Sequence, residues 1–217
     1  MSGQVYFISG IDTNIGKTYA TGYLAKLWQA AGQQLITQKL IQTGNVDFSE
    51  DIQQHRELMG VELLEQDHSK LTMPEIFSYP ASPHLASQID GRAIDFAKIK
   101  VATAALASQF DTVLLEGAGG LMVPLTTEML TIDYIAAQQY PVILVTSGRL
   151  GSINHTLLSL EALKVRQLQL YAIAYNLNDE SQDALISQDT AAYLKSYVAA
   201  NFPEAQWIDI PVLSAEC

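Results

Sequence analysis

A nine-residue segment, Gly10 to Thr18, constrains this chain more than any other part of its sequence. It reads G-I-D-T-N-I-G-K-T and directly follows the apolar run Val5 to Ile8. Its glycines allow the backbone to curl so that successive N–H groups point inward, and a helix that starts near Gly16 adds the positive end of its dipole. Lys17 can then reach the terminal phosphates of a nucleotide, and the Thr18 hydroxyl can ligate magnesium. The segment therefore predicts a phosphate-binding loop, although five residues separate its glycines, one more than in the common pattern.

Length and composition predict one compact domain spanning residues 1–217. Hydrophobic residues make up 48% of the chain and charged residues 16%, a balance that allows a sizeable core and argues against disorder. The formal net charge of −11 produces a field that repels nucleic acid and anionic membranes. Any anionic ligand must therefore be held by a few local cations.

Three features lead us to expect a cytoplasmic protein. The start of the chain lacks the basic residues of a signal peptide, and no apolar stretch is long enough to span a bilayer. The only cysteine, Cys217, is the last residue and cannot staple the fold, which suits a reducing compartment. The sequence thus predicts neither a membrane nor a nucleic-acid partner.

Short apolar runs alternate with longer segments of helical periodicity. The runs are Val5–Ile8, Leu35–Lys39, Thr112–Glu116, Val142–Thr146, Tyr171–Tyr175 and Trp207–Ile210. Helical spacing follows the loop as far as Gly32, a suitable capping residue, and recurs over Ser152–Arg166 and Ala184–Tyr197. Residues 45–95 are less regular, and we expect them to form an insertion over the sheet. This alternation predicts an α/β fold of the P-loop nucleotide-hydrolase type, a mostly parallel sheet with helices on both faces.

Open parallel sheets bind ligands beyond the carboxyl ends of their strands, and here those positions carry glycines and charged residues. The first strand leads into the phosphate-binding loop. The others lead into Lys39 and Thr43-Gly44, Glu116 to Gly120, Ser147 to His155, and Asn176. We expect this edge to form the functional site. Lys39 can neutralise a second anion there, the alternative being a surface lysine at a strand end.

Two carboxylates near the loop are candidates for holding magnesium. Glu116 follows three apolar residues and precedes a glycine run, which favours a role in the site over a merely solvated carboxylate. Asp51 and His55 are four residues apart on a predicted helix, so they share a face. A hard cation selects the Asp51 carboxylate, so we expect His55 to lie on a solvated helix face. The remaining histidines show no ligand spacing, and no zinc site is predicted.

Six short segments form an ordered set that covers nearly the whole chain. They are Gly10–Thr18, Lys39–Gly44, Ser82–His84, Glu116–Gly120, Leu150–His155 and Ile210–Leu213. Any one of them is shared with other nucleotide-dependent synthetases, but the ordered set resembles the dethiobiotin synthetase family, ATP-dependent enzymes of biotin biosynthesis. Two positions depart from the family pattern. Leu40 replaces the proline that usually follows the lysine, and Asn14 occupies a position that is acidic in some members.

The resemblance implies a cyclo-ligase that forms carbon–nitrogen bonds with ATP as co-substrate. It would carboxylate 7,8-diaminononanoate with CO2, phosphorylate the carbamate, and close the ureido ring, giving dethiobiotin, ADP and phosphate. Such chemistry concentrates negative charge, which positioned cations stabilise. Lys17 would act on the transferring phosphoryl group and Lys39 on the carbamate and phosphates. Mg2+ would be the cofactor, held by Thr18, Asp51 and Glu116.

The same resemblance implies the remaining binding residues. Those for ATP are Asn14, Ile15, Gly16, Lys17, Thr18, Tyr19, Asp51, Glu116, Gly117, Ala118, Gly119, Asn176, Pro211, Val212 and Leu213. Thr43 would bind the diaminononanoate, and so would Gly151, Ser152, Ile153 and Asn154 from across a two-fold interface, making the protein a homodimer with shared active sites. Without the resemblance, a simple helix cap in which Ser152 satisfies the first turn explains that segment equally well.

A nucleotide-switched dimer of the partition-ATPase type is the main alternative function. Such proteins carry a lysine near the start of the loop, and residues 9–14 contain none. The synthetase half of a glutamine-dependent amidotransferase is a third reading, but the chain has no room for an ammonia-producing domain. Neither accounts for Thr43, Ser82 and Leu150–His155 as a set.

Overall fold

The computed structural model describes residues 3–178 and 183–212. Its main sheet has six strands in the order β2-β5-β1-β6-β7-β8, and every pairing is parallel. The strands are β1 (Gln4–Gly10), β2 (Leu35–Lys39), β5 (Thr112–Gly120), β6 (Val142–Ser147), β7 (Leu170–Asn176) and β8 (Gln206–Ile210). Each contains one of the six predicted apolar runs, so the predicted strands are confirmed.

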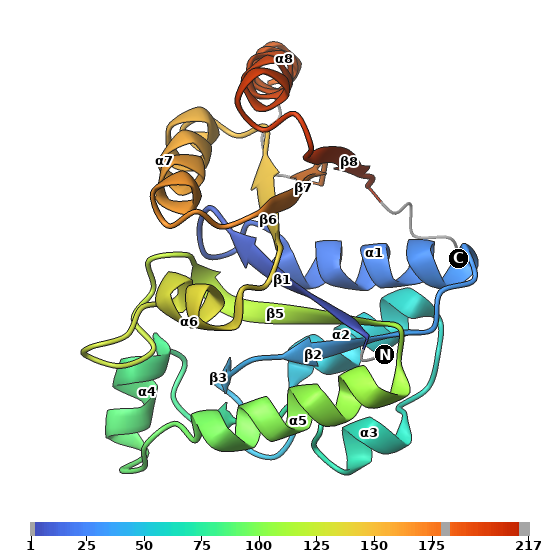
Figure 1. The fold of residues 1–217 in the computed structure, drawn as a ribbon, viewed down its shortest axis with the longest axis vertical. Helices are drawn as coiled ribbons and strands as arrows, with labels where there is room; N and C mark the ends of the chain where they lie inside the picture. The colour runs from blue at the N-terminus through green and yellow to red at the C-terminus, as the bar shows by residue number, and fades with distance from the viewer. Residues whose placement is uncertain (1–2, 179–182, 213–217) are drawn as a thin grey trace.

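Helices cover both faces of this sheet (Figure 1). One face packs against α1 (Lys17–Ala30) and α2 (Glu50–Met59), and the other against α5 (Phe96–Gln109), α6 (Thr131–Gln138), α7 (Ser152–Val165) and α8 (Ala184–Asn201). Successive strand residues point to opposite faces, so Phe7 belongs to one apolar cluster and Ile8 to the other. The predicted α/β class, with a mostly parallel sheet between two helical layers, is confirmed.

The segment between β2 and α5 is more ordered than its sequence indicates. It contains α2, α3 (Glu65–His68), α4 (Pro83–Ile89) and a two-stranded parallel sheet of β3 (Gln42–Thr43) and β4 (Ile76–Phe77). Ser49 caps α2 by accepting a hydrogen bond from the Ile52 N–H. This cap starts the helix so that Asp51 lies in its first turn, next to the ends of β2 and β5.

The topology places one loop at the centre of the sheet edge. From β1 the chain runs outward to β2, returns through β5, and then continues on the other side of β1 with β6. The loop after β1 therefore lies at the point where strand order reverses, the usual ligand position in such sheets. It ends at Gly16, whose φ of 89° lies in the left-handed region and whose added Cβ would be 2.3 Å from Asn176 Nδ2. Both constraints favour glycine there.

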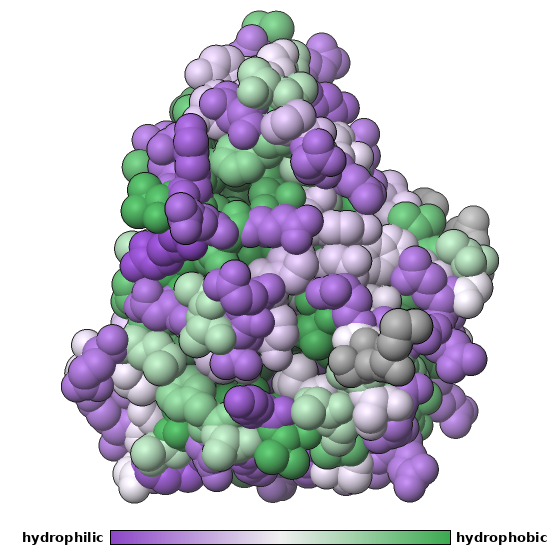
Figure 2. Space-filling model, viewed as in Figure 1, coloured by the Kyte–Doolittle hydropathy of each residue, from purple (hydrophilic) through white to green (hydrophobic). Residues whose placement is uncertain are grey.

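The surface carries no extended apolar band on the face shown in Figure 2, where hydrophilic and hydrophobic residues alternate in small patches. Within the described parts of the chain, none of the helices has the length and apolar character needed to cross a membrane.

Candidate active site

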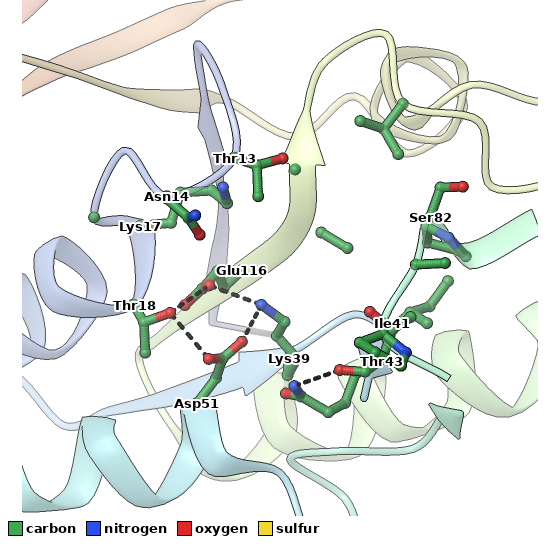
Figure 3. Close-up of a pocket in the computed structure, with 18 of the residues that line it drawn as sticks. Thr13, Asn14, Lys17, Thr18, Lys39, Ile41, Thr43, Asp51, Ser82 and Glu116 are labelled. Carbon is green, nitrogen blue, oxygen red and sulfur yellow. Dashed lines mark hydrogen bonds and ion pairs between the residues drawn. The ribbon is translucent and has the colours of Figure 1, made fainter. Parts of the chain in front are cut away.

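A cavity of about 670 Å³ lies at the carboxyl ends of β1, β2 and β5. Most of the predicted site residues line it, namely Asn14, Gly16, Lys17, Thr18, Tyr19, Lys39, Thr43, Asp51, Glu116, Ala118 and Gly119. In Figure 3, the phosphate-binding loop forms one side of the cavity, and Ile41, Thr43 and Ser82 lie on the opposite side. A ligand bound at the loop and a ligand bound near Thr43 would therefore share one cavity.

A cluster of charged side chains forms the floor of this cavity (Figure 3). Lys39 and Glu116 are partners in the register of β2 and β5, and Lys39 Nζ lies 2.8 Å from Glu116 Oε1. Lys39 also forms an ion pair with Asp51. The Thr18 hydroxyl lies 3.1 Å from both Asp51 Oδ1 and Glu116 Oε1. Side chains from α1, α2, β2 and β5 thus meet at one point.

The pairing keeps the buried groups of the cluster charged. Burial acts to raise the pKa of Glu116, but the Lys39 ammonium and the hydrogen bond from His55 hold that pKa well below its usual range. Burial acts to lower the pKa of Lys39, but Glu116 and Asp51 outweigh it and raise that pKa. Lys17 differs, since burial and the nearby Lys39 charge lower its pKa to about 8. Its ammonium donates to the Asp12 carbonyl at 3.1 Å.

The prediction that His55 lies on a solvated face is wrong. The side chain is fully buried, with Nε2 2.8 Å from Glu116 Oε2 and Nδ1 3.1 Å from Thr37 Oγ1. The spacing that brings Asp51 into the site carries His55 one turn further along the same face of α2, and that face packs on the sheet. The four-residue spacing was the available signal, but the sequence could not show which way the helix faces.

The predicted magnesium ligands suit a hard cation. Thr18, Asp51 and Glu116 present hydroxyl and carboxylate oxygens to one point, which is the donor set that magnesium prefers. Over residues 3–178 and 183–212, no group of three or more His, Cys, Asp and Glu side chains could hold an ion. Thr18, Asp51 and Glu116 alone would therefore supply only part of a coordination shell, with phosphates and water supplying the rest.

Asn176 lies next to the phosphate-binding loop but is not among the residues that line the cavity. Its amide nitrogen donates to the Ile15 carbonyl at 3.0 Å, and its amide oxygen accepts from the Asn178 N–H at 3.0 Å. In this conformation it supports the turn that leads into Gly16. Its amide oxygen keeps a second lone pair, so these bonds are compatible with the predicted contact to a base.

The other predicted nucleotide residues fall into two places. The Tyr19 hydroxyl donates to the Pro211 carbonyl at 2.8 Å, which ties the chain after β8 to α1, and Val212 beside it is exposed. Leu213 lies outside the described residues. Gly117 does not line the cavity, but its carbonyl accepts a hydrogen bond from Lys39 at 3.3 Å.

The residues Gly151 to Asn154 are not among those that line the cavity. Gly151, with φ of 94°, is the residue that caps α7, and its position supplies no side-chain hydrogen bond to the first turn. Ser152 is the first helical residue and therefore not the N-cap, so the alternative in which Ser152 caps the helix is wrong. Arg149 just before it pairs with Asp12 of the phosphate-binding loop, which links the two loops.

Comparison with solved structures supports the fold. The structure of the signal recognition particle receptor FtsY from Elizabethkingia anophelis in complex with GDP aligns with a TM-score of 0.51 and 14% identity. The alignment covers 95% of this chain and 56% of that chain, so this chain spans about half of the FtsY chain. At this level of identity, the likeness shows the architecture alone.

Sequence relatives identify the family. A family model described as an AAA domain matches residues 4–209. ATP-dependent dethiobiotin synthetase BioD 2 of Pasteurella multocida is 51% identical over 92% of this chain and 93% of its own length. ATP-dependent dethiobiotin synthetase BioD of Chlorobaculum tepidum is 50% identical over 100% of this chain and 91% of its own length. With relatives of this similarity along its length, and with a phosphate-binding loop beside a buried Lys39, the chain belongs to the ATP-dependent dethiobiotin synthetase family.

Proposed function

We propose that this protein carboxylates 7,8-diaminononanoate with CO2 and closes the ureido ring at the expense of ATP, releasing dethiobiotin, ADP and phosphate. The observation that supports this most is the position of Lys39. It lies in the same cavity as the phosphate-binding loop, yet on another strand, where it is buried and paired with two carboxylates. The extra lysine of partition-type ATPases lies near the start of the loop instead, so a second cation at the end of β2 favours the synthetase over that alternative.

The proposed reaction has three steps. An amine nitrogen of the substrate attacks CO2 and loses a proton, which gives a carbamate. A carbamate oxygen then attacks the γ-phosphorus of ATP, and ADP leaves. Finally the neighbouring amine attacks the carbamoyl carbon, the bond to the phosphorylated oxygen breaks, and phosphate leaves as the ring closes. The first two steps place negative charge next to the triphosphate, and ring closure, in which the attacking amine loses a proton, releases phosphate beside ADP. Cations that are already in position therefore lower the barriers.

The two lysines have separate roles in this proposal. Lys17 projects from the loop and stabilises the transferring phosphoryl group. Lys39 donates to Asp51, Glu116 and the Gly117 carbonyl. Thr18, Asp51 and Glu116 would hold the magnesium ion, and the carboxylates would then share their charge between the ion and Lys39, whose ammonium has three donors and could also bind the carbamate. The ion supplies charge neutralisation and orients the phosphates.

We further propose that the enzyme is a cytoplasmic homodimer. The residues Gly151 to Asn154 do not line the cavity of their own chain, which fits a role in the partner's site. At the start of α7 they offer the positive end of a helix dipole to the carboxylate of the substrate, and Arg149 adds a positive charge nearby. Thr43 lines the cavity and contacts the same substrate within its own chain.

The dependence of ADP release on the second substrate tests the proposed function. A synthetase releases ADP rapidly only when diaminononanoate and bicarbonate are both present, because the phosphoryl acceptor is the carbamate. A partition-type ATPase releases ADP without either compound. Equal rates of ADP release with and without diaminononanoate would therefore favour the alternative and exclude the synthetase.

A further inference from the structure

A chain of buried polar side chains leads from α3 to the floor of the cavity. Arg56 on α2 binds Asp67 on α3 with two hydrogen bonds, from Nε at 2.8 Å and from Nη2 at 2.9 Å. Its third nitrogen, Nη1, donates to Thr37 Oγ1 at 2.8 Å. Thr37 also contacts His55 Nδ1, and His55 Nε2 contacts Glu116 Oε2. All five side chains are buried.

The direction of each hydrogen bond in this series follows from the two groups at its ends, the Arg56 guanidinium and the Glu116 carboxylate. A guanidinium group can only donate, so Thr37 accepts from Arg56. Among the described residues no other acceptor lies within hydrogen-bond distance of the Thr37 hydroxyl, so it directs its proton to His55 Nδ1. His55 Nδ1 is then an acceptor, and the ring proton lies on Nε2. A carboxylate can only accept, so Nε2–H donates to Glu116. Arg56 thus selects the tautomer of His55 that can hold Glu116.

We propose that His55 is a positioning residue for Glu116, with its tautomer set by Arg56 and Thr37. This inference rests on the proposed function, in which Glu116 helps to hold the magnesium ion. His55 binds one carboxylate oxygen of Glu116, and the other then faces Thr18 and Lys39. Both His55 and Glu116 are 0% exposed, so bulk water does not substitute for the imidazole. The hydrogen bond therefore fixes the plane of the carboxylate at the metal site.

A titration of Mn2+, as a magnesium substitute, measures this role without relying on turnover. The protein is saturated with a non-hydrolysable ATP analogue, and bound Mn2+ is followed by electron paramagnetic resonance. His55→Leu introduces an apolar side chain of similar size and removes both hydrogen bonds. We expect its dissociation constant for Mn2+ to rise about tenfold or more, as for other residues that orient a metal ligand.

Two further variants separate positioning from a general structural role. His55→Gln places an amide nitrogen where Nε2 lies, so it should keep the Mn2+ dissociation constant within about threefold of wild type, whereas His55→Asn reaches only toward Thr37 and should resemble His55→Leu. Thr103→Val is the matched control, because it removes a buried hydroxyl that donates to Gln38 at 2.8 Å, away from the cavity. It should leave Mn2+ binding unchanged.

A double-mutant cycle shows whether His55 acts through Glu116. In a Glu116→Gln background, His55→Leu should weaken Mn2+ binding less than about twofold further, since the positioned carboxylate is already gone. Equal Mn2+ affinity of wild type and His55→Leu would overturn the inference. If His55→Leu does not fold, equal affinities of His55→Gln and His55→Asn would overturn it instead.

The outcome is separable from that of the proposed function. Wild-type protein that binds Mn2+ with the nucleotide but makes no dethiobiotin would contradict the proposed function and leave the role of His55 to be decided by its variants. Wild-type protein that binds no Mn2+ with the nucleotide would overturn both the metal assignment and the positioning role.

Discussion

Lys17 and Lys39 are two buried lysines in one cavity whose pKa values shift in opposite directions. Lys39 has two carboxylate partners, and its pKa is raised. Lys17 bonds to a backbone carbonyl instead, and burial together with the Lys39 charge lowers its pKa to about 8. The phosphates of a nucleotide would give Lys17 negatively charged partners, which Lys39 already has in Asp51 and Glu116. Bound phosphates would therefore raise the pKa of Lys17 back toward its ordinary value.

Replacing Lys17 by Ala should lower turnover about a hundredfold or more. The expected loss corresponds to roughly 3 kcal/mol of transition-state stabilisation, the usual worth of a positioned donor. Steady-state ADP release measures it. Lys26→Ala provides the control, because Lys26 is exposed on the same helix and should keep wild-type turnover. Near-normal turnover of the Lys17 variant would contradict the phosphate-loop assignment.

Replacing Asp67 by Asn should destabilise the fold by about 3 kcal/mol at pH 7, because Arg56 is left buried with a neutral partner. Burial acts to raise the pKa of Asp67, but hydrogen bonds from Arg56 and Thr72 hold it below its ordinary value of 3.8. The ionised group therefore contributes its stability in full above that value, and the contribution is lost as the pH falls through the folded-state pKa. Urea denaturation of both proteins between about pH 3 and 7 should show the difference shrinking in acid; a constant difference would contradict the assignment.

Among the elements, strands were easier to predict than helices, for physical reasons. The strands buried on both faces read as short apolar runs, and the runs at Val142–Thr146 and Thr112–Glu116 needed no further signal. Helix α6 has only two turns, too few to show a period. Helix α5 carries small apolar residues on both faces, and Val101 is 69% exposed, so its buried stripe is not distinct.

The site was predictable where a residue follows a strand and less so where it lies on the insertion. Lys39 ends β2 and Glu116 ends an apolar run within β5, and their meeting follows from the parallel register of the two strands. The burial of His55 and Arg56 depends on Asp67, Thr37 and Glu116, which come from three other elements. Their pairing is a tertiary property that charge and spacing alone do not reveal.

A matched pair of glycine variants tests whether the turn at Gly16, before α1, is needed for binding ATP. Gly16 and Gly32, before and after α1, both have φ of 89°. Gly32→Ala should cost about 1–2 kcal/mol of stability through backbone strain alone, since an added Cβ meets nothing within 4 Å. Gly16→Ala adds a contact with Asn176, so ATP affinity should fall about tenfold or more, as measured by calorimetry. Equal ATP affinity of the two variants would show that the Gly16 turn is not needed.

For the whole molecule, the distribution of charge and the proposed dimer matter most. The chain carries a formal charge of −11, yet three cations, Lys17, Lys39 and Arg149, lie at or near the edge where anionic ligands would bind. The long-range field thus disfavours anions, and short-range contacts must hold them. A substrate carboxylate bound by the start of α7 of a second chain would complete this set of contacts.

Mixing two inactive variants tests whether the sites are shared. Lys17→Ala damages one half of a shared site and Gly151→Pro the other, so a heterodimer keeps one intact site of two. Random exchange gives about one-half heterodimers, so activity should return to about a quarter of normal. Measuring dethiobiotin after subunit exchange, with exchange verified by differently tagged subunits, decides the matter. A mixture that stays inactive after exchange would exclude the cross-chain carboxylate site.

The proposed reaction requires that the carbon of CO2 enters a ring while ATP is cleaved in the same cavity. Incubation with diaminononanoate, Mg2+, ATP and ¹³C-bicarbonate, followed by mass spectrometry, tests this most directly. Dethiobiotin should carry a single additional mass unit, form in equal amount with ADP, and be absent when any one component is omitted. ADP formation without the labelled ring product would contradict it.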